Sequence, residues 1–394
     1  MSDVRRDHHA FTVAHLTTVD MSLRFLVLAQ LRAVVERGGR AIGISAPGPW
    51  VAELEAEGIE HRALPSSTRS MDLAADAHAA RELWTILRRE RVDVLHTHNP
   101  KPGLYGRIIG RAARVPIVVN TVHGLYATEG DPLAKRALVY GLEAIACRAS
   151  DAELYQNPED LALMQRLHLT RRARYLGNGV DLTRFDPARF TSVERDAVRA
   201  ELGIDDPDTI VVGAVGRLVA EKGYPELFDA FATLPPRFAL VVVGDADPDK
   251  PDSLPPALVA RARDRGVRFL GPRDDVDRLY AAMDLFVLAS HREGFPRAAM
   301  EASAMGLPVV ANDIRGCRQV VENGRTGLLV PVGDAAALGG AIAELAHDPA
   351  RRVTMAAAAR DRAQNHFDER HVVDTVLDTY RDVARHKGIA FPPW

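Results

Sequence analysis

The sequence contains few cysteines and no long apolar run. Only Cys147 and Cys317 occur in 394 residues, and neither has neighbours of the metal-ligating kind, so we expect buried thiols in a reducing compartment. No window approaches the roughly 18 uninterrupted apolar residues of a membrane-spanning helix. Residues 1–10 are polar and charged, which does not fit a secretory leader. We therefore expect a cytoplasmic protein.

Two further absences argue against other classes of function. The formal net charge is only −3, so the chain lacks the basic excess typical of proteins that bind nucleic acid. The loop after the first predicted strand, residues 17–23, contains no glycine and therefore lacks the Gly-x-Gly-x-x-Gly turn of dinucleotide-binding domains. A nucleotide-dependent oxidoreductase is thus the weaker alternative, and protection by NADH in thermal unfolding would favour it.

Short apolar runs alternate with amphipathic helical patterns along the chain, which is typical of doubly wound parallel α/β domains. In the first half, strands are predicted at 11–16, 40–45, 58–64, 92–96, 116–120, 151–155 and 174–176, with helices at 22–37, 76–90, 103–113 and 131–148. In the second half, strands are predicted near residues 210, 239, 267, 285, 308 and 327, and helices over 349–385.

The turn-rich segment 177–187 marks a domain junction, because the alternation of strands and helices restarts beyond it. We expect a Rossmann-like N-terminal domain over residues 1–186, a Rossmann-like C-terminal domain over 187–366, and a final helical segment over 367–394. A chain of this length can bury two large cores.

The most informative stretch is EGFPRAAME, residues 293–301. An apolar run that reads as a buried strand precedes it, and Pro296 suits the first position of a helix. The N–H groups that begin a helix have no partner within the helix and can bind an anion. Glu293 would lie at the mouth of the turn and Glu301 about two turns further along. The two carboxylates could then contact different parts of an extended ligand such as a nucleotide-sugar.

A second loop, GRLVAEKG at residues 216–223, carries two cations. It follows the predicted strand 210–215 and precedes another helix. Arg217 and Lys222 can approach a diphosphate from two sides, the first with a planar fork of donors and the second as a compact point charge. Each loop alone could also be an ordinary exposed charged turn. Their sequence contexts favour the functional reading.

Together these motifs resemble family 4 of the retaining glycosyltransferases, which have the GT-B fold. The resemblance rests on EGF-x5-EA followed by GLPVVA at 306–311, on GR-x4-KG, and on the linker NGVD-x2-RF, and it covers roughly residues 11–385. It implies two Rossmann-like, doubly wound parallel-sheet domains that face each other across a cleft. It also implies that the final helix returns to pack on the N-terminal domain.

The resemblance implies a donor site in the C-terminal domain. Arg217 and Lys222 would hold the donor phosphates, Glu293 the hydroxyls of the hexose, and Glu301 those of the ribose. The residues expected to contact the donor are Gly216, Arg217, Lys222, Glu293, Gly294, Phe295, Pro296, Arg297, Ala298 and Glu301.

His123 follows a predicted strand, at the place where open α/β sheets bind ligands. A histidine in such a place can also be purely structural. The resemblance implies that His123 contacts the hydroxymethyl side of the donor sugar, and we count it with Arg217, Lys222 and Glu293 as catalytic. The candidates for the acceptor side are Asp20, Ser22, His98, Asn99 and Lys101. Many family members have glycines in the first loop; here Asp20 or Ser22 would have to cap the helix instead.

Two patterns that can bind metals elsewhere are interpreted differently here. His96 and His98 are spaced like a metal pair, but no third ligand is evident nearby in the sequence. Asp245 and Asp247 follow a predicted strand and run into a proline-containing loop, which is typical of a solvated turn. We therefore expect no metal ion and no cofactor.

A basic stripe on one helix offers a possible membrane contact. Arg107, Arg111 and Arg114 are spaced at i, i+4 and i+7, and together with Lys101 and residues 88–89 they could contact anionic lipid headgroups. An ordinary solvated face is an equal alternative. Peripheral contact with the cytoplasmic face of the membrane is therefore an open expectation.

The expected reaction is a retaining, metal-independent transfer of a hexose or N-acetylhexosamine from a nucleoside-diphosphate sugar, with a UDP-sugar favoured. The acceptor would be a glycan, a polyprenyl-linked or a small molecule, and no nucleic acid is involved. Fixed positive groups would stabilise the charge that develops on the leaving diphosphate. A non-catalytic nucleotide-sugar-binding protein is the alternative, and absence of donor hydrolysis would support it.

Overall fold

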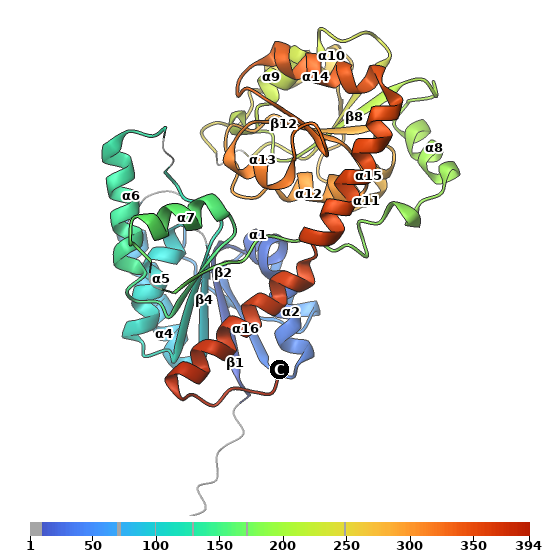
Figure 1. Ribbon diagram of the computed structural model, residues 1–394. Helices are drawn as coiled ribbons and strands as arrows, with labels where there is room; N and C mark the ends of the chain where they lie inside the picture. Colours follow the sequence, from blue (N-terminus) through green and yellow to red (C-terminus); the bar gives the residue numbers. More distant parts are fainter. Residues whose placement is uncertain (1–9, 69–71, 99, 128–129, 171, 248–249) are drawn as a thin grey trace, which may run out of the picture. The chain divides into compact units, whose positions relative to one another are not determined.

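The computed structural model spans residues 1–394 and describes residues 10–68, 72–98, 100–127, 130–170, 172–247 and 250–394 (Figure 1). The chain divides into two compact units. Unit 1 consists of Met1–Gly177 and Arg370–Trp394, and unit 2 of Asn178–Glu369. Each unit is built around its own parallel sheet.

Unit 1 contains a seven-stranded sheet with the order β3-β2-β1-β4-β5-β6-β7, and every pairing in it is parallel. The strands are β1 Thr12–Val19, β2 Arg40–Ala46, β3 Glu60–Ala63, β4 Val94–His98, β5 Ile117–Val122, β6 Ala152–Tyr155 and β7 Ala173–Tyr175. The direction in which the strands are added reverses between β1 and β4. Open α/β sheets bind ligands at the carboxyl ends of strands beside such a switch point.

Both faces of this sheet are covered because its central strands are apolar on both sides. Val13 and Ala14 are neighbours in β1, yet they belong to different buried clusters on opposite faces. The helices of unit 1 are α1 Asp20–Ser22, α2 Leu28–Glu36, α3 Val51–Ala56, α4 Leu73–Glu90, α5 Pro100–Ala112, α6 Leu133–Ala146, α7 Pro158–Arg166 and α16 Glu369–Lys387.

The helix expected over residues 22–37 is interrupted. α1 leads into a π-helical turn, Leu23–Val27, before α2 begins. Val19 precedes α1, and its side chain makes no capping hydrogen bond. The carboxylate of Asp20, the buried first residue of the helix, accepts the backbone N–H of Met21 at 2.8 Å and that of Trp50 at 2.8 Å. Asp20 therefore binds an N–H group at the start of the helix, as the sequence analysis expected.

Helix α16, drawn in red in Figure 1, packs on the sheet of unit 1 although it lies at the end of the chain. Val373, Val376, Leu377 and Tyr380 on its inner face belong to the same buried cluster as Val13 of β1. The return of the final helix to the N-terminal unit is therefore observed, and it follows from the apolar stripe on this helix.

Unit 2 contains a six-stranded sheet with the order β10-β9-β8-β11-β12-β13, and its pairings are also all parallel. The strands are β8 Ile210–Val215, β9 Phe238–Val243, β10 Arg268–Phe269, β11 Leu285–Leu288, β12 Val309–Asn312 and β13 Gly327–Val330. The helices are α8 Ser192–Glu201, α9 Tyr224–Phe231, α10 Pro256–Asp264, α11 Val276–Ala281, α12 Arg297–Ala304, α13 Arg315–Val320, α14 Ala335–His347 and α15 Pro349–His366, with 3₁₀ turns at Pro187–Arg189 and Ala220–Lys222. The switch point of this sheet lies between β8 and β11.

The linker between the units packs with unit 2, whereas the sequence placed it at the end of the N-terminal domain. The N–H of Val180 donates to the carbonyl oxygen of Phe367 at 2.8 Å, and Val180 also forms a β-bridge with Asp368. Arg360 on α15 forms an ion pair with Asp186 at 2.7 Å. These contacts hold both linker segments on unit 2, so the chain changes unit at residues 177–178 and 369–370 rather than at 186 and 366.

Candidate functional site

The loop that follows β8 presents Arg217 and Lys222 at the switch point of unit 2. After Gly216 the chain forms the 3₁₀ turn Ala220–Lys222 and then starts α9. Gly223 joins the two with φ of +70°, and a Cβ atom at this position would lie 1.8 Å from the carbonyl oxygen of Ala289. Only glycine allows such a close approach to the loop after β11. The two cations are therefore carried on a tightly fixed loop.

The loop that follows β11 leads into α12 and contains the expected EGFPRAAME stretch. Helix α12 begins at Arg297, and Pro296 is the residue before it with an extended backbone, so Pro296 is not the first helical residue as expected. No side chain caps this helix. As in any α-helix, hydrogen bonds within the helix do not use the first N–H groups.

Ion pairs connect the predicted cations to carboxylates. The Nζ atom of Lys222 lies 2.6 Å from Oε1 of Glu293, and the hydroxyl of Ser290 donates to the same oxygen at 2.8 Å. The Nη1 atom of Arg217 lies 2.6 Å from Oδ2 of Asp247. The side chain of Arg217 is 39% exposed and that of Lys222 23%, so solvent or a ligand can reach both pairs.

Glu301 is held from two sides. Its Oε1 accepts from Nε of Arg297 at 2.9 Å, one helical turn before it, and its Oε2 accepts from the hydroxyl of Tyr280 at 3.3 Å. Burial raises the pKa of this phenol far above its usual value, and the charge of Glu301 adds to the effect. Tyr280 therefore stays protonated and fixes the orientation of Glu301.

Further backbone contacts bring the two loops of unit 2 together. The N–H of His291 donates to the carbonyl oxygen of Glu221 at 2.9 Å, and the side-chain amide of Asn312, at the end of β12, donates to Ala289 at 2.7 Å. A Cβ atom at Gly316 would lie 2.5 Å from the carbonyl oxygen of Glu293. The structure thus places Lys222 in contact with Glu293, and the loops that carry the two predicted motifs lie side by side.

Four residues in this part of the site were missed as contributors in the sequence analysis: Asp247, Tyr280, Ser290 and Asn312. Ser290 and Asn312 follow or end strands next to the switch point, which is a position that strand prediction alone could have flagged. Asp247 was interpreted as part of a solvated loop. It instead binds Arg217, because the loop after β9 runs beside the loop after β8, as a β-bridge between Leu218 and Ala246 shows.

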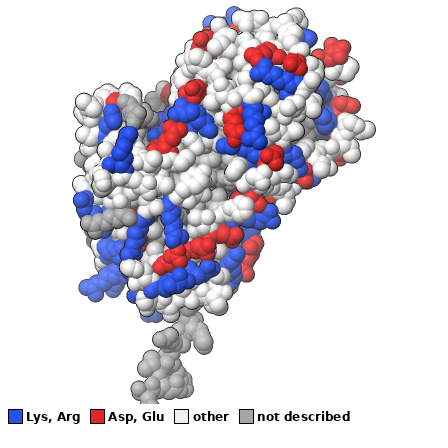
Figure 2. Space-filling view, viewed as in Figure 1, with Lys and Arg blue, Asp and Glu red and all other residues white. Residues whose placement is uncertain are grey.

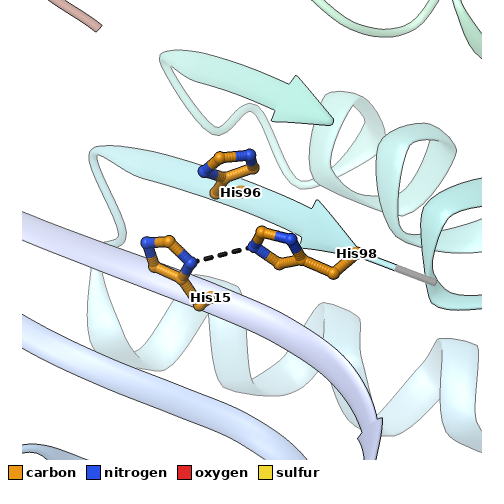
Figure 3. Close-up of side chains that lie close together, drawn as sticks. All are labelled: His15, His96 and His98. Atoms are coloured by element: carbon orange, nitrogen blue, oxygen red, sulfur yellow. Dashed lines mark hydrogen bonds between the residues drawn. The ribbon is translucent and has the colours of Figure 1, made fainter. Parts of the chain in front are cut away.

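In unit 1 the switch point is occupied by histidines. Figure 3 shows His15 on β1 beside His96 and His98 on β4, with a hydrogen bond of 2.9 Å between Nδ1 of His15 and Nε2 of His98. The parallel register places His15 directly opposite His96. From His98 the contacts continue to His123, with 3.0 Å between Nδ1 of His98 and Nε2 of His123. Nδ1 of His123 then lies 3.1 Å from Oε1 of Gln156.

The same chain continues in the other direction. The hydroxyl of Tyr380 on α16 lies 3.3 Å from Nε2 of His15 and 2.6 Å from Nδ1 of His96, and Nε2 of His96 lies 2.7 Å from the hydroxyl of Thr121. Every ring nitrogen of the four histidines therefore has a hydrogen-bond partner. We call this set, from Gln156 through the four rings and Tyr380 to Thr121, the histidine chain.

Burial keeps the histidine chain neutral. It lowers the pKa of His15 to about 3 and that of His123 to about 4, and the pKa values of His96 and His98 also fall well below the usual value. His15 supplies the third histidine that the sequence did not reveal, and the three rings on β1 and β4 lie close enough to be considered as metal ligands. The ring nitrogens of these three histidines make hydrogen bonds to one another, to His123 and to the hydroxyls of Tyr380 and Thr121.

Two other acceptor-side candidates, Lys101 and Ser22, are not members of the histidine chain. Lys101 forms an ion pair with Asp76 at 2.6 Å and donates to the carbonyl oxygen of Thr68 at 3.1 Å, so it has structural partners. Ser22 is half-buried on α1. Asn99 lies outside the described residues. Of the acceptor-side candidates, His98 is the one that the structure places next to His123.

The predicted basic stripe does not form one exposed surface. Arg107 is 1% exposed and is bound between Glu153, at 2.9 Å, and Glu143, at 2.7 Å. Burial disfavours its charge, but the two carboxylates outweigh that effect and raise its pKa. Arg111 binds Asp151 at 2.8 Å. Because α5 packs the side that carries Arg107 against β4 and β5, Arg107 cannot contribute to an exposed basic surface.

Charged side chains of both signs are interspersed over much of the face shown in Figure 2. This pattern agrees with the small net charge and with the many ion pairs of the structure. Within the part of the chain that the structure describes, no helix is both long and apolar enough to cross a bilayer.

Comparisons with known proteins match both units. A family model described as "Glycosyltransferase Family 4" matches residues 26–184, and a model described as "Glycosyl transferases group 1" matches residues 209–348. The chain is 30% identical over 335 residues to the UDP-Gal:alpha-D-GlcNAc-diphosphoundecaprenol alpha-1,3-galactosyltransferase of Escherichia coli, with 82% of this chain and 84% of that protein covered. It is 32% identical over 318 residues to the D-inositol 3-phosphate glycosyltransferase of Saccharomonospora viridis, with 76% and 72% covered.

A similar fold occurs in HepE of Anabaena, solved in complex with UDP and glucose. The TM-score is 0.79 at 24% sequence identity, and the match covers 95% of this chain and 100% of that one. The two family models fall on the two units in the order that the motifs predicted. These matches argue against the oxidoreductase alternative.

Proposed function

The chain belongs to glycosyltransferase family 4 and has the GT-B fold, and we propose that it transfers a hexose or N-acetylhexosamine from a UDP-sugar to a lipid-linked acceptor. We further propose that the transfer retains the anomeric configuration and requires no metal ion. The observation that carries the proposal is the pair of accessible cations, Arg217 and Lys222, on the fixed loop at the switch point of unit 2.

A diphosphate would compete with Asp247 and Glu293 for these two cations. Carboxylate and phosphate oxygens accept the same charge-assisted hydrogen bonds, and the fork of Arg217 matches a phosphate group. Partly exposed ion pairs of this kind contribute at most about 1 kcal/mol to stability. A ligand with two phosphate groups can therefore displace them at little cost.

The two glutamates would then hold the sugars at either end of the donor. Once Lys222 turns to the phosphates, Glu293 is available to accept hydrogen bonds from hexose hydroxyls. Glu301, oriented by Tyr280 and Arg297, would accept from the ribose hydroxyls. The proposal also keeps His123 of unit 1 as a contact of the hydroxymethyl group of the hexose and residues 294–298 of unit 2 as contacts of the donor.

Cleavage of the bond between the anomeric carbon and the diphosphate places negative charge on the leaving oxygen. Arg217, Lys222 and the first N–H groups of α12 would stabilise that charge, so a bound cation is not needed for this step. The leaving oxygen would accept the proton of the acceptor hydroxyl while that hydroxyl attacks the same face of the sugar. No protein base is required, and the configuration is retained.

The acceptor is proposed from the relatives. The Escherichia coli relative acts on a diphosphoundecaprenol-linked sugar, whereas the relative of Saccharomonospora viridis acts on D-inositol 3-phosphate. We favour the lipid-linked class, with the protein on the cytoplasmic face of the membrane. The small-molecule class remains the second candidate.

The proposal is tested with a donor and acceptor panel. Purified protein is incubated with UDP-glucose, UDP-galactose, UDP-N-acetylglucosamine and GDP-mannose, and release of the nucleoside diphosphate is measured with and without undecaprenyl-diphosphate-linked N-acetylglucosamine or D-inositol 3-phosphate. We expect release from a UDP-sugar that the lipid-linked acceptor stimulates, an α-linked product by NMR, and unchanged rates in EDTA.

Each part of the proposal can fail separately in this panel. A β-linked product would overturn retention, and loss of activity in EDTA that Mg²⁺ or Mn²⁺ restores would overturn metal independence. Use of GDP-mannose alone would overturn the donor assignment. Stimulation by D-inositol 3-phosphate alone would replace the lipid-linked acceptor with the small-molecule class.

A further inference from the structure

The side chain of Gln156 carries hydrogen-bond donors that the protein itself does not use. Gln156 directly follows β6, and its amide oxygen lies 3.1 Å from Nδ1 of His123. Its amide nitrogen has no hydrogen-bond partner among the residues that the structure describes. Gln156 is only 5% exposed, but solvent reaches this nitrogen, because it is not among the unpaired side-chain atoms that the fold encloses completely.

The neighbouring ring of His123 has no unused nitrogen. Its Nε2 lies 3.0 Å from Nδ1 of His98, and its Nδ1 faces the amide oxygen of Gln156. A sugar hydroxyl that bonded to either ring nitrogen would have to displace one of these partners, whereas the amide nitrogen of Gln156 can donate without any such loss. The available donor at this strand end is therefore the amide.

The far end of the histidine chain decides which way its protons point. Burial lowers the pKa values of all four rings, so each ring is neutral and has one N–H donor and one acceptor nitrogen. The hydroxyl of Thr121, which is 2% exposed, has a single partner within the described residues, Nε2 of His96 at 2.7 Å. A buried hydroxyl that donates to nothing costs free energy, so Thr121 donates to His96.

This one donation sets the direction of every other contact. Because Nε2 of His96 accepts, the proton of that ring lies on Nδ1 and is donated to the hydroxyl of Tyr380 at 2.6 Å. Tyr380 in turn donates to Nε2 of His15 at 3.3 Å. The next two contacts run the same way, from Nδ1 of one ring to Nε2 of the next (Figure 3). His123 is left with its proton on Nδ1, which the amide oxygen of Gln156 accepts.

We propose that the amide nitrogen of Gln156 donates a hydrogen bond to a hydroxyl group of a carbohydrate substrate, and that the histidine chain holds the amide in this orientation. The inference deepens the proposed function and rests on it, because it requires a sugar beside His123. Gln156 is the residue that contacts the substrate, and Thr121 is a positioning residue. The hydroxyl can belong to the transferred hexose or to the sugar of the acceptor, and kinetics separate the two.

The contact is tested with Gln156→Glu, which keeps an oxygen for His123 and removes both N–H donors. Gln156→Met removes the same donors without adding a charge. The matched control is Gln165→Glu, because Gln165 is exposed on α7 of the same unit. Transfer is measured with UDP-glucose or UDP-galactose as donor and undecaprenyl-diphosphate-linked N-acetylglucosamine as acceptor, and thermal unfolding of each variant is recorded alongside.

We expect both Gln156 variants to lower kcat/KM at least about tenfold while the control keeps the wild-type value. A higher KM for the UDP-sugar assigns the hydroxyl to the transferred hexose, and a higher KM for the lipid-linked sugar assigns it to the acceptor. Wild-type kinetics in the two Gln156 variants would overturn the proposal.

The orientation of the amide is tested without turnover. NMR of the ring nitrogens in protein labelled on histidine shows where each proton lies, and we expect it on Nδ1 in all four rings of the histidine chain. Thr121→Val removes the hydroxyl that sets the direction, so Nε2 protons should appear, whereas Thr121→Ser keeps the hydroxyl and should keep the wild-type spectrum. Nε2 protons in the wild type, or an unchanged spectrum in Thr121→Val, would overturn the positioning role.

These results are distinguishable from failure of the proposed function. If no donor supports transfer but the four rings carry their protons on Nδ1, the orientation of the amide stands and the sugar substrate falls. If transfer occurs and the Gln156 variants keep wild-type kinetics, the proposed function stands and the contact by Gln156 falls.

Discussion

Both units carry polar side chains at the switch point of their sheet, but these side chains are accessible ion pairs in unit 2 and a buried hydrogen-bonded network in unit 1. In unit 2, the switch point carries ion pairs such as Lys222–Glu293, which solvent can reach. In unit 1, it carries the histidine chain, whose inner rings are fully buried and whose nitrogens all have partners within the protein. Unit 1 also has more Lys and Arg than Asp and Glu, whereas unit 2 has fewer.

This difference shows how the same fold can serve two tasks. A charged ligand can displace the carboxylate of an accessible ion pair, because a phosphate oxygen accepts the same charge-assisted hydrogen bond from the cation. A saturated, buried and neutral network cannot exchange its partners in this way without leaving polar atoms unpaired. Unit 2 is therefore suited to hold a diphosphate, and unit 1 to hold its strand ends in one arrangement.

The largest expected effect comes from breaking a buried ion pair of unit 1. Arg107→Ala would leave the carboxylate of Glu153 buried without its cation, and we expect a loss of about 3–5 kcal/mol in the free energy of unfolding measured in urea. Arg325→Ala, which removes a 62% exposed cation paired with Glu322, is the matched control and should change stability by less than about 0.5 kcal/mol. Similar losses of unfolding free energy in both variants would contradict the contrast between buried and exposed ion pairs.

The corresponding change in unit 2 should affect activity instead of stability. On the proposed mechanism, Lys222→Ala or Arg217→Ala should lower turnover by about 10²–10³, because each would remove a group proposed to stabilise the leaving diphosphate. Glu301→Ala should mainly weaken UDP binding, which calorimetry can measure. The stability of all three variants should stay close to wild type. Near-normal turnover of the Arg217 and Lys222 variants would refute their roles.

A fall in pH should destabilise unit 1 through the histidine chain. Unfolded His15 takes up a proton near pH 6.5, whereas burial lowers its pKa in the folded protein to about 3. Stability is therefore complete above pH 6.5 and is lost as the pH falls below it, by on the order of 2 kcal/mol at pH 5 for this ring. Urea unfolding at pH 7 and pH 5 measures the slope. His15→Asn should reduce the slope, and an unchanged slope in that variant would count against this assignment.

The smallest effect is expected for removal of one hydroxyl. Tyr380→Phe would leave Nε2 of His15 and Nδ1 of His96 without their shared partner, at a cost of about 1–2 kcal/mol in unfolding free energy. Thr354→Val, which removes a solvent-exposed hydroxyl, should change the free energy of unfolding by less than about 0.5 kcal/mol and serves as the control. Equal effects of the two variants would mean that the histidine chain does not depend on α16.

Much of the fold could be predicted because local patterns of apolar residues indicate its strands and helices. The six strands of unit 2 all lie where apolar runs predicted them, and the return of the last helix agrees with its apolar stripe. The linker was harder to assign, because its contacts with residues 367–368 are made across nearly half of the chain. The π-helical turn at Leu23–Val27 has no sequence signal of the kind used for caps and breaks.

In the candidate site, too, residues in local motifs could be predicted, whereas partners brought in by the tertiary structure could not. Arg217, Lys222, Glu293 and Glu301 lie in recognisable motifs, but their partners Asp247 and Tyr280 depend on which loops become neighbours. The third histidine beside His96 and His98 was missed for the same reason. His15 lies 81 residues earlier, and only the pairing of β1 with β4 brings it into contact.

The proton positions in the histidine chain have a consequence for the residue at its accessible end. With the amide oxygen of Gln156 accepting from His123, each ring must donate from one nitrogen and accept at the other, so all tautomers point the same way. Rotation of that single amide would reverse every one of them together, and no net charge would enter the interior. The tautomer of His123 is thus tied to the orientation of the Tyr380 hydroxyl on the last helix of the chain.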